Sequence, residues 1–142
     1  MAYTGKCACG AVTLEITGDP IATRQCWCRQ CQQIAAGGPT NNVIFTGEDV
    51  TVTGALATSQ WTAASGNTLT FNFCPSCGTH VYGQSSARLH LKTVRLGVID
   101  ESHGLKPEVA IWTSDAPAWA YIDPALESWP QQPPAPPPPP AA

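Results

Sequence analysis

Cys74-Pro75-Ser76-Cys77-Gly78 is the stretch of sequence that decides the fold, together with Cys7-Ala8-Cys9-Gly10 near the other end of the chain. Each stretch forms a tight turn that presents two sulfur atoms toward one point. The glycine after Cys77 can adopt positive φ, which lets backbone N–H groups turn toward the thiolates. Four thiolates at about 2.3 Å are the usual ligand set of a closed structural zinc site. We therefore predict that Cys7, Cys9, Cys74 and Cys77 bind one zinc ion, which joins the first hairpin to a distant strand end.

Disulfide bonds are the alternative use of these cysteines. Cysteines one or two positions apart cannot pair with each other without strain, and the chain has seven cysteines, an odd number. Disulfides also persist mainly in oxidising compartments. Residues 1–6, Met-Ala-Tyr-Thr-Gly-Lys, contain no apolar run of the kind found in a signal peptide. We expect a cytoplasmic protein whose cysteines bind zinc.

Three further cysteines lie within residues 26–31, Cys-Trp-Cys-Arg-Gln-Cys. A catalytic zinc ion keeps three protein ligands, because its fourth position must accept water or substrate. We therefore predict a second zinc ion on Cys26, Cys28 and Cys31. A histidine could close this site instead, and the candidates are His80, His90 and His103.

The charge of such a cluster limits the chemistry that it can perform. Three thiolates around Zn²⁺ leave a net charge of about −1, which weakens the activation of a bound water but keeps a thiolate nucleophilic. A thiol or a carbonyl oxygen is therefore a better fourth ligand than an activated hydroxide. The sequence contains neither an HExxH pattern nor a Gly-x-Ser-x-Gly elbow that would offer a competing mechanism.

Composition indicates one folded domain followed by a tail. The chain has 142 residues, is 43% hydrophobic and carries a formal net charge of −3, so a broad cationic surface for nucleic acid is not expected. No stretch approaches the roughly 20 apolar residues that span a bilayer. Nine of the 14 prolines lie from residue 124 onward. We predict a zinc-binding domain over residues 1–129 and a disordered proline-rich tail over 130–142, either solvated or a ligand for aromatic grooves.

Short alternating segments indicate an all-β fold. Period-two patterns bounded by Gly, Asn, Asp or Pro predict strands near residues 12–17, 42–45, 50–53, 68–73, 89–96 and 109–112. Helical turns are expected only at residues 28–36, which contain few β-branched residues, and at 118–122 after Pro117.

Three cysteine motifs in this order resemble the glutathione-dependent formaldehyde-activating enzyme family, which includes centromere protein V. The resemblance rests on residues 5–12, 26–31 and 73–79, and residues 94–100 and 110–114 are similar to later segments of the family. It implies a beta-tent fold, with structural zinc on the two distant turns and catalytic zinc on residues 26, 28 and 31. The implied reaction is the reversible addition of glutathione to formaldehyde, formally that of a carbon–sulfur lyase.

This resemblance makes the partners a small-molecule thiol and a small aldehyde, and it directs attention to the residues that flank the second cluster. We predict substrate contacts there, and the candidates are Trp27, Arg29, Gln30, Gln33, Gly37, Gly38, Thr40 and Asn42. Trp112 could form a wall of the pocket or belong to the core. Arg24 and Arg29 are the cations near the cluster in sequence. Two other hypotheses are a non-catalytic zinc module that binds a protein partner and a thiol redox sensor.

Overall fold

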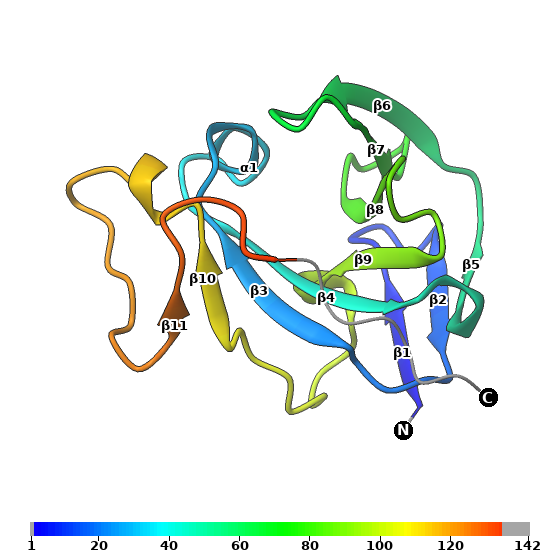
Figure 1. Ribbon diagram of the computed structural model, residues 1–142. Helices are drawn as coiled ribbons and strands as arrows, with labels where there is room; N and C mark the ends of the chain where they lie inside the picture. Colours follow the sequence, from blue (N-terminus) through cyan, green and yellow to red (C-terminus); the bar gives the residue numbers. More distant parts are fainter. Residues whose placement is uncertain (1, 135–142) are drawn as a thin grey trace.

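The computed structural model describes residues 2–134 and consists of two β-sheets with one short α-helix. The larger sheet has eight strands in the order β11-β10-β3-β4-β9-β8-β7-β6. Its strands are β3 (Ala22–Cys26), β4 (Thr40–Thr46), β6 (Ala57–Thr62), β7 (Thr68–Phe73), β8 (His80–Ser85), β9 (Leu91–Arg95), β10 (Val109–Ile111) and β11 (Glu127–Ser128). In Figure 1, β3, β4 and β9 cross the centre of the molecule, with β6 and β7 on one side and β10 and β11 on the other. The expected all-β architecture is confirmed.

The smaller sheet has the order β1-β2-β5 and is antiparallel. Its strands are β1 (Tyr3–Lys6), β2 (Thr13–Ile16) and β5 (Val50–Thr53). A bridge between Gly5 and Ile99 connects it to the chain just after β9. At Gly5 an added Cβ would overlap the carbonyl oxygen of Val98, so the close approach of these two segments requires glycine.

The main core fills the space between the two sheets. The alternation along β2 places Leu14 and Ile16 in this core, and β4 contributes Val43 and Phe45. All four side chains are at most 2% exposed. Burial of this kind stabilises a fold by about 1.5–3 kcal/mol for each large apolar side chain. The core therefore fixes the smaller sheet against the centre of the larger one.

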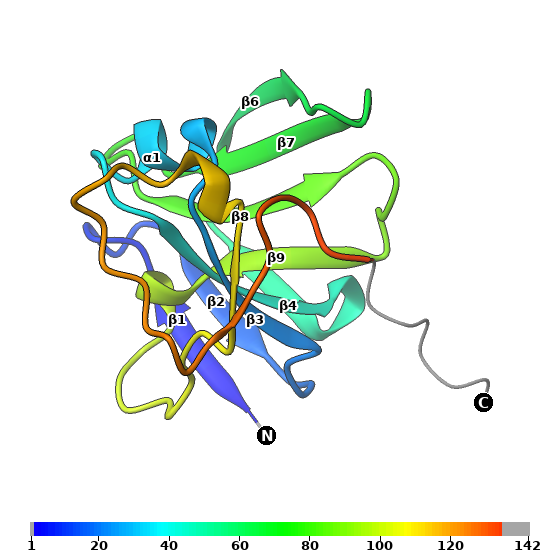
Figure 2. The same cartoon turned by 60° about the vertical axis from the view of Figure 1, so that its left-hand side comes forward.

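A second, smaller core lies where β3 and β10 end. Cys26, Cys31 and Ile111 are buried there, and Trp112 and Trp129 pack against them. The helix α1 (Arg29–Ile34) follows β3, and the short 3-10 turn η3 (Thr113–Asp115) follows β10. Figure 2 shows α1 beside η3. Two segments about 80 residues apart in sequence thus enclose the predicted second metal site.

Several elements differ from the sequence predictions. The helix expected over residues 28–36 is α1, but residues 118–122 contain only a turn at 118–119. The chain also continues to pack beyond residue 129, because the backbone N–H and hydroxyl of Ser114 donate to the Pro130 carbonyl at 3.2 and 2.6 Å. Residues 135–142, which contain the run of five prolines predicted to be disordered, lie outside the described residues. Among residues 2–134, no helix is long and apolar enough to cross a membrane.

Candidate metal centres

The first cysteine cluster joins the two sheets. Cys7 directly follows β1 and Cys9 lies in the turn that leads to β2, whereas Cys74 and Cys77 belong to the turn between β7 and β8. The four sulfur atoms lie within 4.8 Å of one another. The Sγ atoms of Cys7 and Cys9 are 3.6 Å apart, and those of Cys9 and Cys74 are 3.8 Å apart. A tetrahedron with zinc–sulfur bonds of about 2.3 Å has edges of about 3.8 Å. The sulfur positions therefore fit a tetrahedral zinc site.

Backbone geometry holds these two turns in the conformation that zinc requires. Gly10 and Gly78 have positive φ, 81° and 76°, and their N–H groups donate to the carbonyl oxygens of Cys7 and Cys74. The Val12 N–H donates to the Cys7 sulfur at 3.3 Å, as expected for a thiolate ligand. Substitution of either glycine would strain its turn, because L-residues with a side chain rarely adopt positive φ.

Thr79 links the two turns. Its hydroxyl oxygen accepts a hydrogen bond from the Ala8 N–H at 3.2 Å and lies 3.2 Å from the Cys77 sulfur. The hydroxyl and backbone N–H of Thr79 lower the pKa of Cys77 to about 5. These hydrogen bonds favour the thiolate form of Cys77, which is the form that binds a metal ion.

The second cluster is formed by one short segment of chain. Cys26 ends β3, Cys28 caps the N-terminus of α1, and Cys31 lies in the first turn of that helix. Their sulfur atoms also lie within 4.8 Å of one another. The Cys28 sulfur accepts a hydrogen bond from the Cys31 N–H at 3.4 Å, and the Cys31 sulfur accepts one from the Thr40 hydroxyl at 3.0 Å. These donors suit thiolate ligands, so the residues present fit a zinc ion here as well.

The three sulfurs of this cluster compete for protons. Hydrogen bonds from Cys26 and Cys31 lower the pKa of Cys28 to about 3. Hydrogen bonds with Cys28 and Cys31, followed by burial, raise the pKa of Cys26. For Cys31, the bond from Cys26 lowers the pKa, but the bond to Cys28 and burial outweigh it, and its pKa is raised. A divalent cation would replace the remaining protons and neutralise most of the resulting charge.

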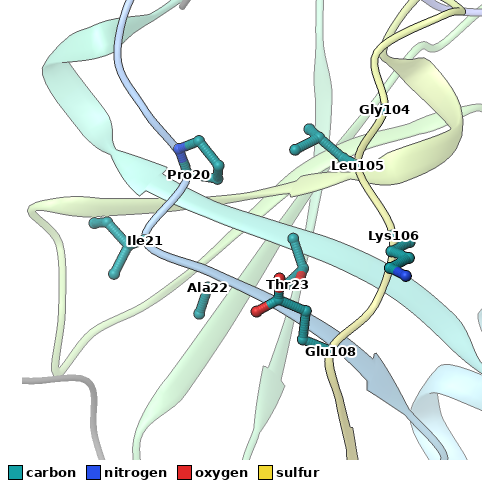
Figure 3. Close-up of a pocket in the computed structure, with 8 residues that line it drawn as sticks. All are labelled: Pro20, Ile21, Ala22, Thr23, Gly104, Leu105, Lys106 and Glu108. Atoms are coloured by element: carbon teal, nitrogen blue, oxygen red, sulfur yellow. The ribbon is translucent and has the colours of Figure 1, made fainter. Parts of the chain in front are cut away.

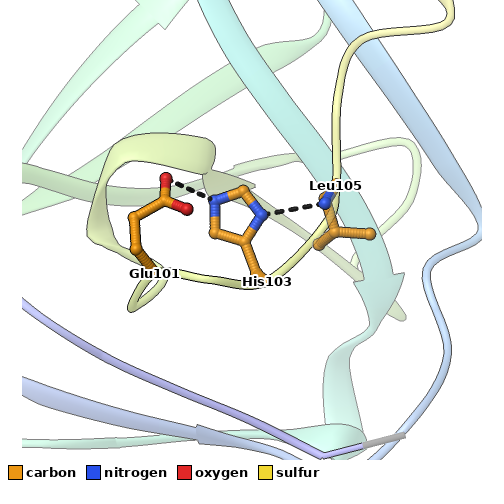
Figure 4. Close-up of polar contacts among 3 residues, drawn as sticks. All are labelled: Glu101, His103 and Leu105. Atoms are coloured by element: carbon orange, nitrogen blue, oxygen red, sulfur yellow. Dashed lines mark hydrogen bonds and ion pairs between the residues drawn. The ribbon is translucent and has the colours of Figure 1, made fainter.

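No histidine in residues 2–134 joins the three-cysteine cluster. His80 instead stacks on Phe73, with ring centroids 5.5 Å apart. His103 pairs with Glu101 at 3.2 Å and accepts a hydrogen bond from the Leu105 N–H at 2.9 Å (Figure 4). His90 lies beside a surface hollow near Leu89. The described part of the chain thus supplies three ligands to the second cluster.

The predicted substrate contacts around α1 differ in their exposure. Trp27 is buried and donates its indole N–H to Gln25, whereas Gln30 is half-buried and Gln33 is exposed. Arg29 is exposed, and its guanidinium donates to the Gln32 side chain at 2.9 Å. The exposed face of α1 therefore presents one cation and two amide groups next to the cluster.

The remaining candidates follow α1 or lie on β4 and β10. Gly37 and Gly38 are half-buried in the loop after α1. Thr40 and Asn42 are 5% and 7% exposed, and the Asn42 amide donates to the Thr40 hydroxyl at 2.9 Å. Trp112 packs against the three-cysteine cluster. Thr40 and Asn42 thus contact the cluster or each other within the protein.

Two residues near the cluster were missed in the sequence. Gln32 is buried and donates to the carbonyl oxygens of Trp27 at 2.6 Å and of Asp115 at 2.9 Å, which fixes the cysteine segment against η3. Arg95 on β9 donates to the Asn42 side chain at 2.6 Å. Arg95 reaches Asn42 because β9 pairs with β4, and the two residues are 53 positions apart in sequence. No local motif indicates this contact.

A separate hollow of about 170 Å³ lies between β3 and the chain that precedes β10. Figure 3 shows its lining, which includes Ile21, Thr23, Leu105, Lys106 and Glu108. None of its lining residues belongs to either cysteine cluster. Any ligand in this hollow would not contact the candidate metal ligands.

Comparisons with known proteins agree with the arrangement of the cysteines. A sequence model described as "Glutathione-dependent formaldehyde-activating enzyme" matches residues 2–115. No curated protein is significantly similar to the chain. A crystal structure of a Rhodobacter sphaeroides protein superposes with a TM-score of 0.57 at 21% sequence identity, and the match covers 89% of this chain and 98% of that one. This similarity indicates a shared fold.

Proposed function

Because the chain belongs to the glutathione-dependent formaldehyde-activating enzyme family, we propose that it catalyses reversible adduct formation between a thiol, glutathione or a similar compound, and a small aldehyde such as formaldehyde. The sulfur of the thiol forms a bond to the carbonyl carbon, and the carbonyl oxygen takes up the proton that the thiol has lost. In the reverse direction the carbon–sulfur bond breaks, which is a lyase reaction. No external oxidant or reductant is required in either direction.

The three-cysteine cluster is the observation that carries this proposal. Cys26, Cys28 and Cys31 would hold a zinc ion with one coordination position free, and that ion would keep a thiol deprotonated or polarise a carbonyl oxygen. The other cluster would hold a second, structural zinc ion on four cysteines. This division of closed and open sites supports catalysis at the three-cysteine cluster.

The chain's own residues have separate tasks in this proposal. Trp112 and Trp129 pack against the small core that contains Cys26 and Cys31 and would limit the access of water to it. Thr40 holds the Cys31 sulfur by its 3.0 Å hydrogen bond. Arg29 is exposed next to the cluster, so its guanidinium can bind a carboxylate of the thiol substrate. We assign the remaining substrate contacts to Gln30, Gln33 and Gly38, whereas Trp27, Thr40 and Asn42 are buried and hydrogen-bonded within the protein and would support the site from behind.

Exchange NMR with ¹³C-formaldehyde and glutathione tests this function, since the rate of interconversion between free formaldehyde and its glutathione adduct can be measured at equilibrium. Zinc-loaded protein should accelerate the exchange, and Cys28→Ser should return it to the uncatalysed rate. Ser76→Ala is the matched control, because Ser76 is exposed in the other cysteine turn and is not a ligand. If wild-type protein that carries two zinc ions leaves the exchange at its uncatalysed rate, the proposal is refuted. That result would favour a non-catalytic zinc module that binds a protein partner.

A further inference from the structure

Arg95 is a cation withdrawn from water beside the three-cysteine cluster. It lies at the end of β9, directly opposite Asn42 of β4. Its guanidinium lies over the Phe71 ring, 5.4 Å from the centroid. Its Nε and Nη2 atoms are buried and have no hydrogen-bond partner. Hydrogen bonding alone therefore does not account for the burial of this charge.

A buried arginine normally pairs with a carboxylate. Within residues 2–134, no carboxylate forms an ion pair with Arg95. Asn42 and Thr40 link Arg95 to Cys31 by hydrogen bonds, so the cysteine cluster is the anionic group that this cation faces.

A directed chain of hydrogen bonds connects the two groups. Arg95 Nη1 donates to Asn42 Oδ1 at 2.6 Å, Asn42 Nδ2 donates to Thr40 Oγ1 at 2.9 Å, and the Thr40 hydroxyl donates to Cys31 Sγ at 3.0 Å. Chemistry fixes this direction, because a guanidinium can only donate. Asn42 must therefore present its oxygen to Arg95 and its amide N–H to Thr40. The hydroxyl proton of Thr40 is then free for the sulfur.

We propose that Arg95 is the counter-cation of the three-cysteine cluster, and that it positions Cys31 through Asn42 and Thr40 as a thiolate metal ligand. Three thiolates and a divalent ion carry a net charge of about −1. The charge of Arg95 offsets it and leaves the buried assembly nearly neutral. An anionic thiol can then approach the free coordination position with less repulsion.

This inference rests on the metal site that we propose at the cluster and is independent of the identity of the reaction. The inference predicts a change in metal affinity. Removal of a residue that hydrogen-bonds to a metal ligand typically lowers metal affinity by about 10- to 100-fold. Zinc affinity at the two sites can be measured by competition with a chromophoric chelator. Cobalt substitution gives a second readout, because sulfur-to-cobalt charge-transfer absorption arises at both cysteine clusters and the part lost in Cys28→Ser belongs to the second.

Arg95→Gln should lower the zinc affinity of the three-cysteine cluster about 10- to 100-fold and leave that of the four-cysteine cluster unchanged. Arg88→Gln is the matched control, since it removes the same charge from a side chain for which the structure shows no contact with the cluster, and it should change neither affinity. Arg95→Lys keeps the charge and should retain most of the affinity. A merely structural role would give the same loss in both Arg95 variants.

Thr40→Val keeps the shape of the side chain and leaves Arg95 in place, but it removes the hydroxyl that connects Asn42 to Cys31. This variant therefore provides a second test if Arg95→Gln does not fold. Thr40→Val should also lower the zinc affinity of the three-cysteine cluster. Wild-type affinity in Arg95→Gln, or equal losses in Arg95→Gln and Arg95→Lys, would overturn the inference. Wild-type protein with one zinc ion would overturn both the proposed site and this inference. Two zinc ions without accelerated exchange would contradict only the proposed reaction.

Discussion

Cys77→Ser should destabilise the fold far more than Cys28→Ser, because the two clusters join parts of the chain at very different separations. Cys9 and Cys74 are 65 residues apart in sequence. A cross-link over that distance removes about 4 kcal/mol of chain entropy from the unfolded state in the loop-closure model for disulfides. The same model gives about 2 kcal/mol for a cross-link within residues 26–31. Domains of this size have unfolding free energies of about 5–15 kcal/mol, so loss of the first cluster removes much of the total.

Urea unfolding and metal content measure this difference together. Cys77→Ser should lose the structural zinc ion and about 4 kcal/mol of unfolding free energy, whereas Cys28→Ser should retain one zinc ion and lose about 2 kcal/mol. Ser76→Ala, in the same turn as Cys77, should retain two zinc ions and wild-type stability. Equal losses of stability in the two cysteine variants, or loss of both ions from Cys28→Ser, would refute the division into a structural and an open site.

Two further predictions concern the core and a histidine. Gly5→Ala should cost about 1–3 kcal/mol in urea unfolding, because its Cβ would overlap the Val98 carbonyl; wild-type stability would show that β1 moves freely. Burial, followed by the charge of Arg95, lowers the pKa of His80, so wild-type stability should fall as pH drops below about 6.5, where the unfolded histidine takes up a proton. His80→Phe keeps the stacking and should remove this part of the pH dependence, and identical pH slopes for the two proteins would contradict that assignment.

Strands with a clear apolar alternation were predictable from the sequence, and strands without one were not. Residues 12–17 alternate and form β2, and the strand predicted near residues 42–45 is part of β4, although all four of these residues are buried. β1 escaped prediction because a glycine occupies one of its buried positions, where the Val98 carbonyl leaves no room for a side chain. β6 is the edge strand of the larger sheet and is largely exposed, so its sequence carries no alternation that a core would impose.

The candidate ligands were predictable for a similar reason, while their electrostatic partner was not. Cysteines two or three positions apart can converge on one ion whatever the fold around them, and the structure brings together both predicted clusters. The cations near the second cluster in sequence were Arg24 and Arg29. Arg95 lies at the end of the predicted strand 89–96, and it reaches the cluster only through the pairing of β9 with β4. Long-range register decides such contacts, and no local pattern encodes it.

The free coordination position that we propose at the second cluster is compatible with the fold, because the protein itself holds these cysteines in place. Gln32 ties the segment to Trp27 and Asp115, and the cluster forms part of the smaller core with Ile111. Cys7 and Cys74 of the first cluster belong to the main core, but its four ligands come from two turns far apart in sequence, which the side chain of Thr79 connects. A metal ion there would add a second link between the sheets beside the main core, and a free position would weaken that link. The site that we propose to exchange ligands therefore lies where the fold depends less on a metal ion.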